Sequence, residues 1–117
     1  MSDMHLGVVE SRFADLIWAN EPISTQELTR LCEQELGWKR TTTYTVLKRL
    51  SERGLFRNDG GQVSSLVSRD AFYGHRSCQV IEESFGGSLP AFLAAFASHR
   101  SLTEDEVAQI RRLIEEV

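Results

Sequence analysis

The sequence of 117 residues has only two cysteines, two prolines and no long hydrophobic run. No apolar segment approaches the roughly 18 residues needed to cross a bilayer, so we expect no insertion into a membrane. Residues 1–7 lack the basic region and the apolar block of a secretory signal. We therefore expect a cytoplasmic protein with one domain, or a small domain with an appendage, around a modest core.

The two cysteines, Cys32 and Cys78, form neither a CxxC motif nor a Cys/His pair at the spacing of zinc ligands. Each shares a helical stripe with apolar residues, which predicts buried and reduced thiols. The histidines His5, His75 and His99 stand singly. The sequence thus predicts no metal and no cofactor. One alternative stays open, in which a cysteine or a histidine senses metal, redox state or a small ligand.

Cations are scarce outside one segment. Residues 38–57 carry six Lys and Arg against one Glu, whereas residues 1–37 carry two cations against seven acids, and residues 58–117 carry five against nine. The net charge of −4 therefore conceals a basic segment with a local charge of +5. Such a segment attracts phosphates. A solvated cationic face is the alternative for any cluster of this kind.

The basic segment contains a helix, expected at residues 40–53, that has two different sides. Val46, Leu47 and Leu50 lie together at a rotation of about 100° per residue, and Gly54 is typical of a helix end in a left-handed turn. The other side presents hydroxyls, a phenol and cations, as a helix in the major groove of DNA requires. The candidates for DNA contact, including one in the following segment, are Lys39, Arg40, Thr41, Thr42, Tyr44, Thr45, Lys48, Arg49 and Arg57.

Two roles are expected among these candidates. Lys39, Arg40 and Arg49 would contact mainly phosphates, which sets affinity and salt dependence without reading sequence. The residues expected to meet base edges, through hydroxyls, thymine methyl groups or a lysine–guanine bond, are Thr41, Thr42, Tyr44, Thr45 and Lys48. Two alternatives remain open. Thr41 or Thr42 can instead cap the helix, and Tyr44 can pack against the segment that follows.

Two helices are predicted before this one. Apolar spacing places the first at about residues 8–20. The second starts at Ser24, which can form a capping box with Glu27, and it ends at Gly37. Three short helices with a tight link between the second and the third resemble a helix-turn-helix unit.

After the third helix, the spacing of apolar residues changes from that of a helix to that of a β-strand. Residues 55–58 and 62–68 are predicted as two strands around a turn that contains two glycines. A hairpin directly after the third helix is the wing of a winged helix. This wing carries one cation, Arg57, so few phosphate contacts are expected from it. Residues 1–68 are therefore predicted to be a winged helix-turn-helix DNA-binding domain.

Residues 69–117 are predicted to form three helices, with Ser68, Ser88 and Thr103 as their N-caps. Short helices have too little surface in one chain to bury the apolar side chains present, so we expect a helical dimerisation domain and a twofold homodimer. The residues expected at the interface are Phe72, Ile81, Phe85, Leu89, Phe92, Leu93, Phe96, Val107, Ile110 and Ile114. The alternative is that this region packs back onto the first three helices. The predicted fold class is mainly α with a small β-hairpin wing.

These features, in this order, resemble the penicillinase and methicillin-resistance repressors and the related copper-responsive repressors (BlaI/MecI/CopY type). The matching positions cover nearly the whole chain. They are Trp18, 37–38, Thr42, Thr45, Leu47, 49–50, Gly54, 66–68, 85–88 and 102–106. The resemblance implies a homodimeric transcriptional repressor that binds a palindromic operator in double-stranded DNA.

The resemblance also implies a mode of release. In the antibiotic-responsive members, a membrane metalloprotease pathway leads to a cut in the helix after the Gly-Gly pair, before a phenylalanine and commonly after asparagine. The matching bond here is Ala95–Phe96, where alanine replaces asparagine. Copper-responsive members carry a C-terminal cysteine motif, which residues 111–117 lack, so copper sensing through that motif is not expected. The inducing signal stays open.

Two other classes of function are weighed against a repressor. An enzyme is not expected, because the sequence has no nucleophile–base pair, no carboxylate pair and no glycine loop suited to phosphates. A winged-helix module that binds a protein partner and no DNA remains an alternative. Salt-dependent binding to a random duplex distinguishes the two, since only a DNA-binding protein releases counterions from phosphates.

Overall fold

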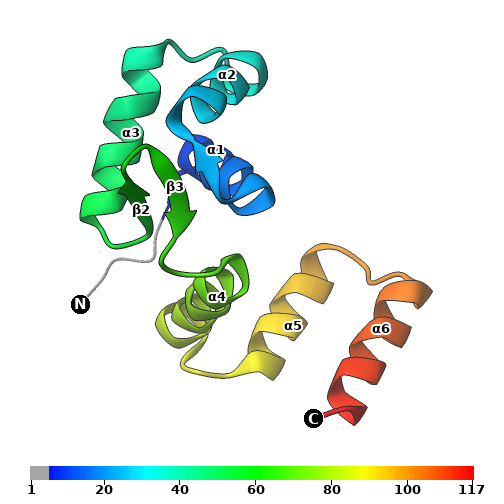
Figure 1. The fold of residues 1–117 in the computed structure, drawn as a ribbon. Helices are drawn as coiled ribbons and strands as arrows, with labels where there is room; N and C mark the ends of the chain where they lie inside the picture. The colour runs from blue at the N-terminus through cyan, green and yellow to red at the C-terminus, as the bar shows by residue number, and fades with distance from the viewer. Residues whose placement is uncertain (1–5) are drawn as a thin grey trace. The chain divides into compact units, whose positions relative to one another are not determined.

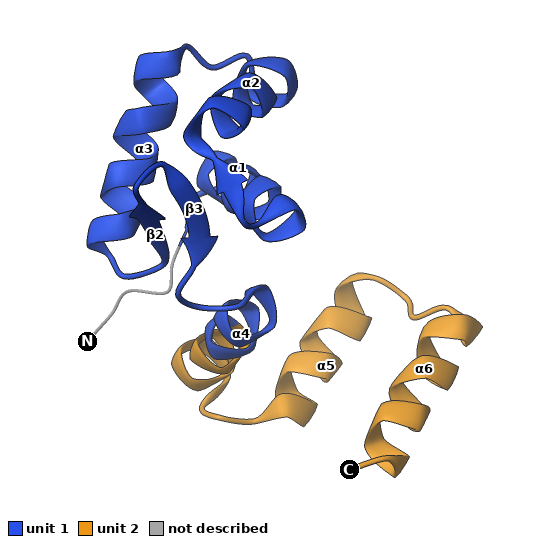
Figure 2. Ribbon diagram, in the orientation of Figure 1, with its two compact units in different colours: residues 1–76 blue, residues 77–117 orange. Residues whose placement is uncertain are grey.

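The computed structural model describes residues 6–117, which contain six helices and a small antiparallel sheet (Figure 1). The chain divides into two compact units, residues 1–76 and residues 77–117, which are described separately (Figure 2). The predicted fold class, mainly α with a β-hairpin wing followed by a helical region, is confirmed. His5 lies outside the described residues.

Three helices form the body of unit 1, close to their predicted positions. They are α1 (Val8–Asn20), α2 (Thr25–Leu36) and α3 (Arg40–Glu52). Each contributes to one apolar core, in which Phe13, Ile17, Leu28 and Leu50 have no exposed surface. Full burial of such a side chain stabilises the fold by about 1.5–3 kcal/mol. The apolar sides of the three helices are therefore buried against one another within this unit.

The ends of α2 follow from single residues. Ser24 Oγ accepts a hydrogen bond from the Glu27 N–H at 3.1 Å, as the predicted N-cap requires. Gly37 ends the helix with a φ of 67°, a conformation in which any other residue would be strained. The Glu27 carboxylate, which was predicted to complete a capping box, pairs with Arg30 on the next turn.

The wing is a hairpin of β2 (Phe56–Asp59) and β3 (Gln62–Ser65), slightly shorter than predicted. Gly60 and Gly61 form its turn with φ values of 60° and 90°, which suit a two-residue hairpin turn. Sequence reasoning missed a third strand, β1 (Ile23–Ser24), which pairs antiparallel with β3 to give the order β1-β3-β2. A strand of two residues is too short to show an alternating period.

The helix α4 (Arg69–Phe85) begins as predicted, with Ser68 Oγ accepting from the Ala71 N–H at 3.1 Å. Phe72, however, was assigned to the dimer interface, and that prediction was wrong. It is 2% exposed and belongs to the core of unit 1, with its ring 5.7 Å from that of Trp18. A side chain already buried within its own chain has no surface to offer a partner. This packing also places the division between the units inside α4, after Arg76, and not before residue 69.

Unit 2 contains the remainder of α4, followed by α5 (Leu89–His99) and α6 (Glu104–Glu115). Its helix starts match the predictions: Ser88 caps α5, and Thr103 forms a reciprocal capping box with Glu106. Cys78 is exposed, which corrects the prediction that it is buried. None of the residues 77–117 is buried in the single chain. Unit 2 therefore has an apolar surface but no core of its own.

Replacing Trp18 by Phe tests the link between α1 and the segment before α4. The indole Nε1–H of Trp18 donates to the Val67 carbonyl at 3.0 Å, and Phe keeps a ring there but has no donor. We expect the free energy of unfolding to fall by about 1–3 kcal/mol, because a partly buried carbonyl loses its partner. Urea unfolding of the full chain measures this, and an unchanged midpoint would contradict the role given to this hydrogen bond.

The pKa of Glu106 predicts how α6 responds to acid. A hydrogen bond from Arg100, followed by the backbone N–H of Thr103, lowers this pKa from 4.5 to about 2. A lowered folded-state pKa stabilises the helix above pH 4.5, and this contribution is lost as the pH falls toward 2. Circular dichroism over this range should show a smaller acid-induced loss of helix in Glu106→Gln than in the wild type. Glu104→Gln, which removes a carboxylate from the same turn and leaves the capping box intact, should respond like the wild type.

Candidate nucleic-acid interface

The helix α3 presents one side to the core and the other to solvent. The buried side is Thr43, Val46, Leu47 and Leu50, and this includes the three apolar residues predicted for it. The exposed side contains Thr41, Thr45 and Lys48 on successive turns, together with Thr42 and Arg49. The structure therefore brings most of the predicted DNA-contacting residues onto one surface.

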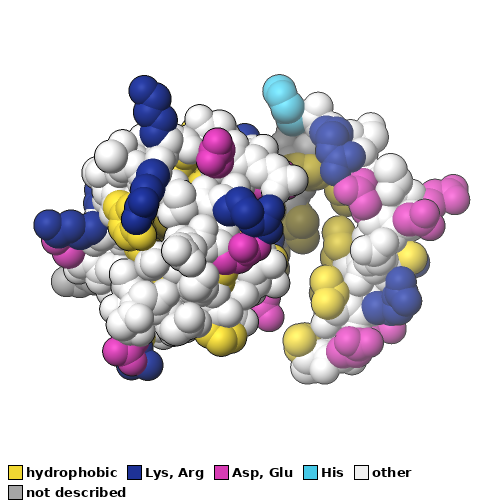
Figure 3. Space-filling model, turned by 45° about the horizontal axis from the view of Figure 1, so that its top comes forward, with side chains coloured by type: hydrophobic (Ala, Val, Ile, Leu, Met, Phe, Trp, Pro, Cys, Tyr) yellow, Lys and Arg dark blue, Asp and Glu magenta, His cyan; other side chains and the backbone are white. Residues whose placement is uncertain are grey.

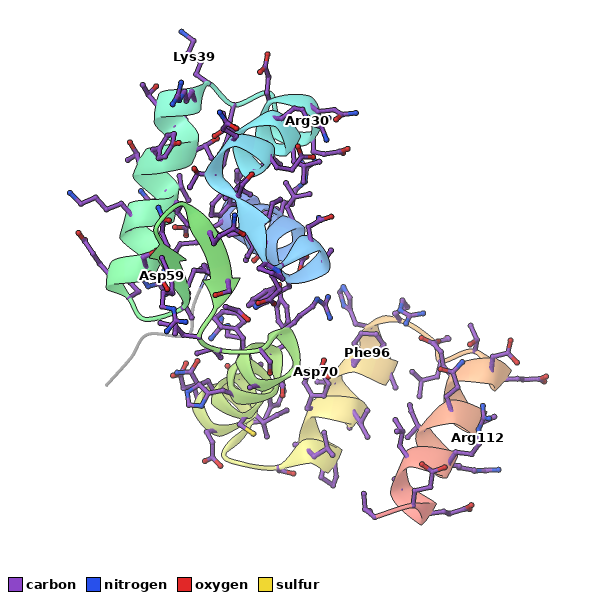
Figure 4. All side chains as sticks on the ribbon, viewed as in Figure 1. Arg30, Lys39, Asp59, Asp70, Phe96 and Arg112 are labelled. Atoms are coloured by element: carbon purple, nitrogen blue, oxygen red, sulfur yellow. The ribbon has the colours of Figure 1, made fainter. Side chains whose placement is uncertain are left out.

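The start of α3 settles one of the alternatives for its threonines. Lys39 occupies the N-cap position without a side-chain hydrogen bond, so neither Thr41 nor Thr42 caps the helix. Both are exposed in the first turn, and Lys39 extends away from the helix start (Figure 4). The positive end of the helix dipole adds to the charges of Lys39 and Arg40. This end of α3 is accordingly suited to an anion.

The hydroxyl of Thr45 is already engaged within the helix. Its Oγ1 donates to the Thr41 carbonyl at 2.8 Å. This leaves the Thr45 oxygen free to accept a hydrogen bond and its methyl group free for apolar contact. Lys48, one turn further along the same side, is exposed. An acceptor, a methyl group and a cation thus lie next to one another on the outer side of α3.

Tyr44 lies toward α2, and its phenol engages Thr25 at the start of that helix. This hydrogen bond, followed by one with Arg40, lowers the pKa of the phenol. The Arg40 guanidinium also lies over the Tyr44 ring, 5.6 Å from its centre. A hollow of about 160 Å³ here is lined by Arg40 and Tyr44 with Gln26 and Thr29 of α2. Sequence reasoning missed the α2 residues, because nothing local shows which part of α2 meets α3.

Arg49 differs from the other cations of α3 because a carboxylate of α1 holds it. Its Nη2 and Nε donate to Glu10 Oε2 at 2.9 and 3.2 Å. Burial raises the pKa of Glu10, but hydrogen bonds from the Gly7 N–H and from Arg49, with the charges of Arg49 and Arg53, outweigh it and leave the pKa lowered. The pair therefore stays ionised at neutral pH. The sequence predicts Arg49 as a phosphate contact, and nothing local to either residue indicates that Glu10 is its partner.

The wing adds little positive charge. Arg57 is exposed on β2. Asp59, which Figure 4 labels, follows it on the same strand. Asn58 Oδ1 accepts from the Gly61 N–H at 3.0 Å and supports the turn. A second hollow, of about 350 Å³, lies between the wing and α3 and is lined by Tyr44, Leu47, Lys48, Ser51 and Asn58. Lys and Arg side chains project from the part of unit 1 that carries α3, as the dark blue atoms of Figure 3 show.

The cysteines were also considered as part of a metal or thiol sensor. Cys32 is buried, as predicted, and burial raises the pKa of its thiol although a hydrogen bond with Thr43 opposes this. No three His, Cys, Asp or Glu side chains among residues 6–117 lie close enough together to hold a metal ion. The same residues include no helix with the length and apolar composition to cross a bilayer.

The apolar residues predicted for dimerisation lie in unit 2, apart from Phe72. Ile81, Phe85, Phe92, Leu93, Val107 and Ile110 are half-buried, whereas Leu89, Phe96 and Ile114 are exposed. Phe92 links the ring of Phe85, 5.5 Å away, to that of Phe96, 6.3 Å away. Hydrophobic side chains show on one side of this unit and charged ones on the other (Figure 3). A groove of about 540 Å³ between α4 and α5 is lined in part by Cys78, Ile81, Leu89 and Phe92.

Comparison with known proteins agrees with this arrangement. Among curated proteins, none matched the chain. A sequence model of the penicillinase repressor family matches residues 6–116, which is nearly the whole chain and includes both units. The chain belongs to the penicillinase repressor family of DNA-binding transcriptional repressors.

Proposed function

We propose that the protein is a homodimeric repressor that lays α3 of each chain in the major groove of a palindromic operator. The observation that carries the proposal is the outward side of α3, where Thr41, Thr45 and Lys48 lie on successive turns opposite a buried side. A helix held in this way can enter the groove without losing its packing. The membership of the family supports the same assignment.

Within this proposal the side chains divide by what they contact. Lys39 and Arg40, at the start of α3, neutralise phosphates and position the helix without reading sequence. Thr41, Thr45 and Lys48 meet base edges, where a lysine pairs best with the O6 and N7 acceptors of guanine. Thr42 and Tyr44 lie at the edges of this surface, and Tyr44 contributes through its ring because its phenol is engaged with α2. Arg57 of the wing adds one further phosphate contact.

The dimer is proposed to form through unit 2. This unit has no buried side chain in the single chain, and Phe96, Leu89 and Ile114 remain 38%, 55% and 61% exposed. Each Å² of apolar surface removed from water stabilises an assembly by about 25 cal/mol. Association of two such surfaces therefore provides the core that one copy lacks. A twofold dimer uses the same surface on both chains. Two symmetric copies of α3 then read two half-sites, which makes the operator palindromic.

Release of the repressor is proposed to follow from loss of unit 2, and a cut at Ala95–Phe96 would achieve this. The bond lies inside α5, where the Ser98 hydroxyl donates to the Ala95 carbonyl at 2.9 Å. Proteolysis needs this turn to open, and local opening is easiest where few apolar contacts are buried. Ala95 and Phe96 are both exposed in the single chain. Figure 4 shows the Phe96 side chain on α5. The signal that would start such a cut is not encoded in these contacts.

Selection from a pool of random duplexes tests the function as a whole. A repressor of this kind enriches a palindromic site, and its affinity for any duplex falls as salt rises because phosphate contacts release counterions. A winged helix that binds a protein partner instead would enrich no site and would show no salt-dependent duplex binding. That second outcome would overturn the proposal.

Replacing Lys48 by Ala should relax the base preference. We expect a loss of about 1–3 kcal/mol of discrimination at one base pair in each half-site, because a contact to a base edge is removed. Lys39→Ala is the matched control, since it should weaken all duplexes alike and flatten the salt slope by about 0.9 per chain. Titration of selected and substituted operators measures both effects. Unchanged discrimination in Lys48→Ala would remove this residue from the reading surface.

Replacing Phe96 by Asp should break the dimer. A charge placed in an apolar interface must be desolvated there without a partner, which costs more than most interfaces can offset. Gln109→Asp is the control, because it adds the same charge at an exposed polar position of α6. Sedimentation equilibrium should give a monomer for the first variant and a dimer for the second. A dimer of Phe96→Asp would place the interface on another surface.

A further inference from the structure

The pair of Glu10 and Arg49 raises a question about the charge of the DNA-facing surface. Arg49 lies one turn after Thr45 and directly beside Lys48 in α3. A cation at this position is within the surface proposed to enter the groove. Its guanidinium nevertheless donates two hydrogen bonds to a carboxylate of α1, at 2.9 and 3.2 Å.

Glu10 is held in place for this contact from its other side. Its Oε1 accepts from the Gly7 N–H at 3.2 Å at the start of α1, while Oε2 accepts from Arg49. The Glu10 side chain is only 24% exposed, whereas that of Arg49 is 52% exposed. The carboxylate is thus positioned by the helix start, and the guanidinium is brought to it.

This arrangement changes how Arg49 can contribute to binding. Attraction to any duplex depends on the number of phosphates that protein cations neutralise, and each one steepens the salt dependence. A guanidinium paired with a carboxylate is already neutralised, so it brings no net charge to a phosphate. A phosphate would have to displace Glu10, which the Gly7 N–H holds in position.

We propose that Glu10 is a specificity-determining residue, which withholds Arg49 from phosphates and so keeps the affinity for non-operator DNA low. Arg49 is then a positioning residue that fastens α3 to α1, and it is not a phosphate contact. The inference rests on the proposed function, because it assumes that α3 faces DNA. It replaces the phosphate role expected from the sequence, since that role counted the cation without its partner.

The test uses Glu10→Gln in the full chain. Glutamine can still accept from the Gly7 N–H, so the start of α1 is kept while the charge that binds Arg49 is removed. With a random-sequence duplex as the probe, we expect the salt slope to steepen by about 0.9 per bound chain. When salt rises fourfold, affinity should accordingly fall more than that of the wild type, by a further factor of about 3.5 for each bound chain, or about 12 for a dimer with both chains on the duplex. The ratio of affinities for the selected operator and the random duplex should decrease.

Three further variants make the result decisive. Arg49→Gln and the double variant Glu10→Gln/Arg49→Gln should both keep the wild-type salt slope, because neither has a free cation at this position. Asp15→Asn removes a carboxylate from the same helix, one that pairs with Arg69 at 3.1 Å and not with α3, and it should also leave the slope unchanged. Thermal unfolding checks that each variant is folded.

The outcomes separate this inference from the proposed function. If the wild type binds no duplex, the proposed function fails and the inference fails with it. If the wild type binds but Glu10→Gln has the same slope, only the inference is overturned. A slope flattened by about 0.9 in Arg49→Gln would show that Arg49 already contacts a phosphate. An equal steepening of the salt slope in Asp15→Asn would mean that the change in net charge of the protein causes the effect, and it would overturn the role given to Glu10.

Discussion

Burial of one side of α3 is the constraint on which the proposed DNA-facing surface depends. Thr43 and its apolar neighbours on this side are each no more than 6% exposed, so the helix cannot turn about its axis without opening the core. Fixing that side also fixes where Thr41, Thr45 and Lys48 point. Because α1, α2 and the wing all pack around the same core, the packing that stabilises unit 1 also sets the orientation of its outer surface. A substitution in this core would thus disturb both.

The electrostatic character of that surface is set by pairing as much as by composition. Six cations lie in residues 38–57, in a chain whose net charge is −4. Arg49 is bound by Glu10, whose carboxylate offsets its charge, whereas Arg40 lies over the neutral ring of Tyr44 and keeps its positive charge. Lys39 and Lys48 extend from the helix instead. Counting charges along the sequence therefore overstates how many cations remain available to phosphates.

The two units differ in how much of their apolar surface is buried within the single chain. Unit 1 closes around fully buried residues such as Phe13 and Phe56, and it takes Phe72 from α4 into the same core. In unit 2 the capped helices are well defined, but none of their side chains is buried. Helix signals in the sequence describe each helix alone and say little about what covers it. A second copy of unit 2 is the partner that we propose, because apolar side chains such as Leu89, Phe96 and Ile114 stay exposed in the single chain.

Features that depend on neighbours along the chain could be predicted from the sequence. The helix positions, the cap at Ser24, the end at Gly37 and the glycine turn of the wing were predicted correctly, because a cap or a turn is decided within a few residues. The place of Phe72 in the core of unit 1 and the pairing of Glu10 with Arg49 became known from the three-dimensional packing alone. Each of these contacts joins residues that are distant in sequence, with no periodicity or motif connecting them. Such pairings follow from how the helices pack, and that packing is a property of the whole fold.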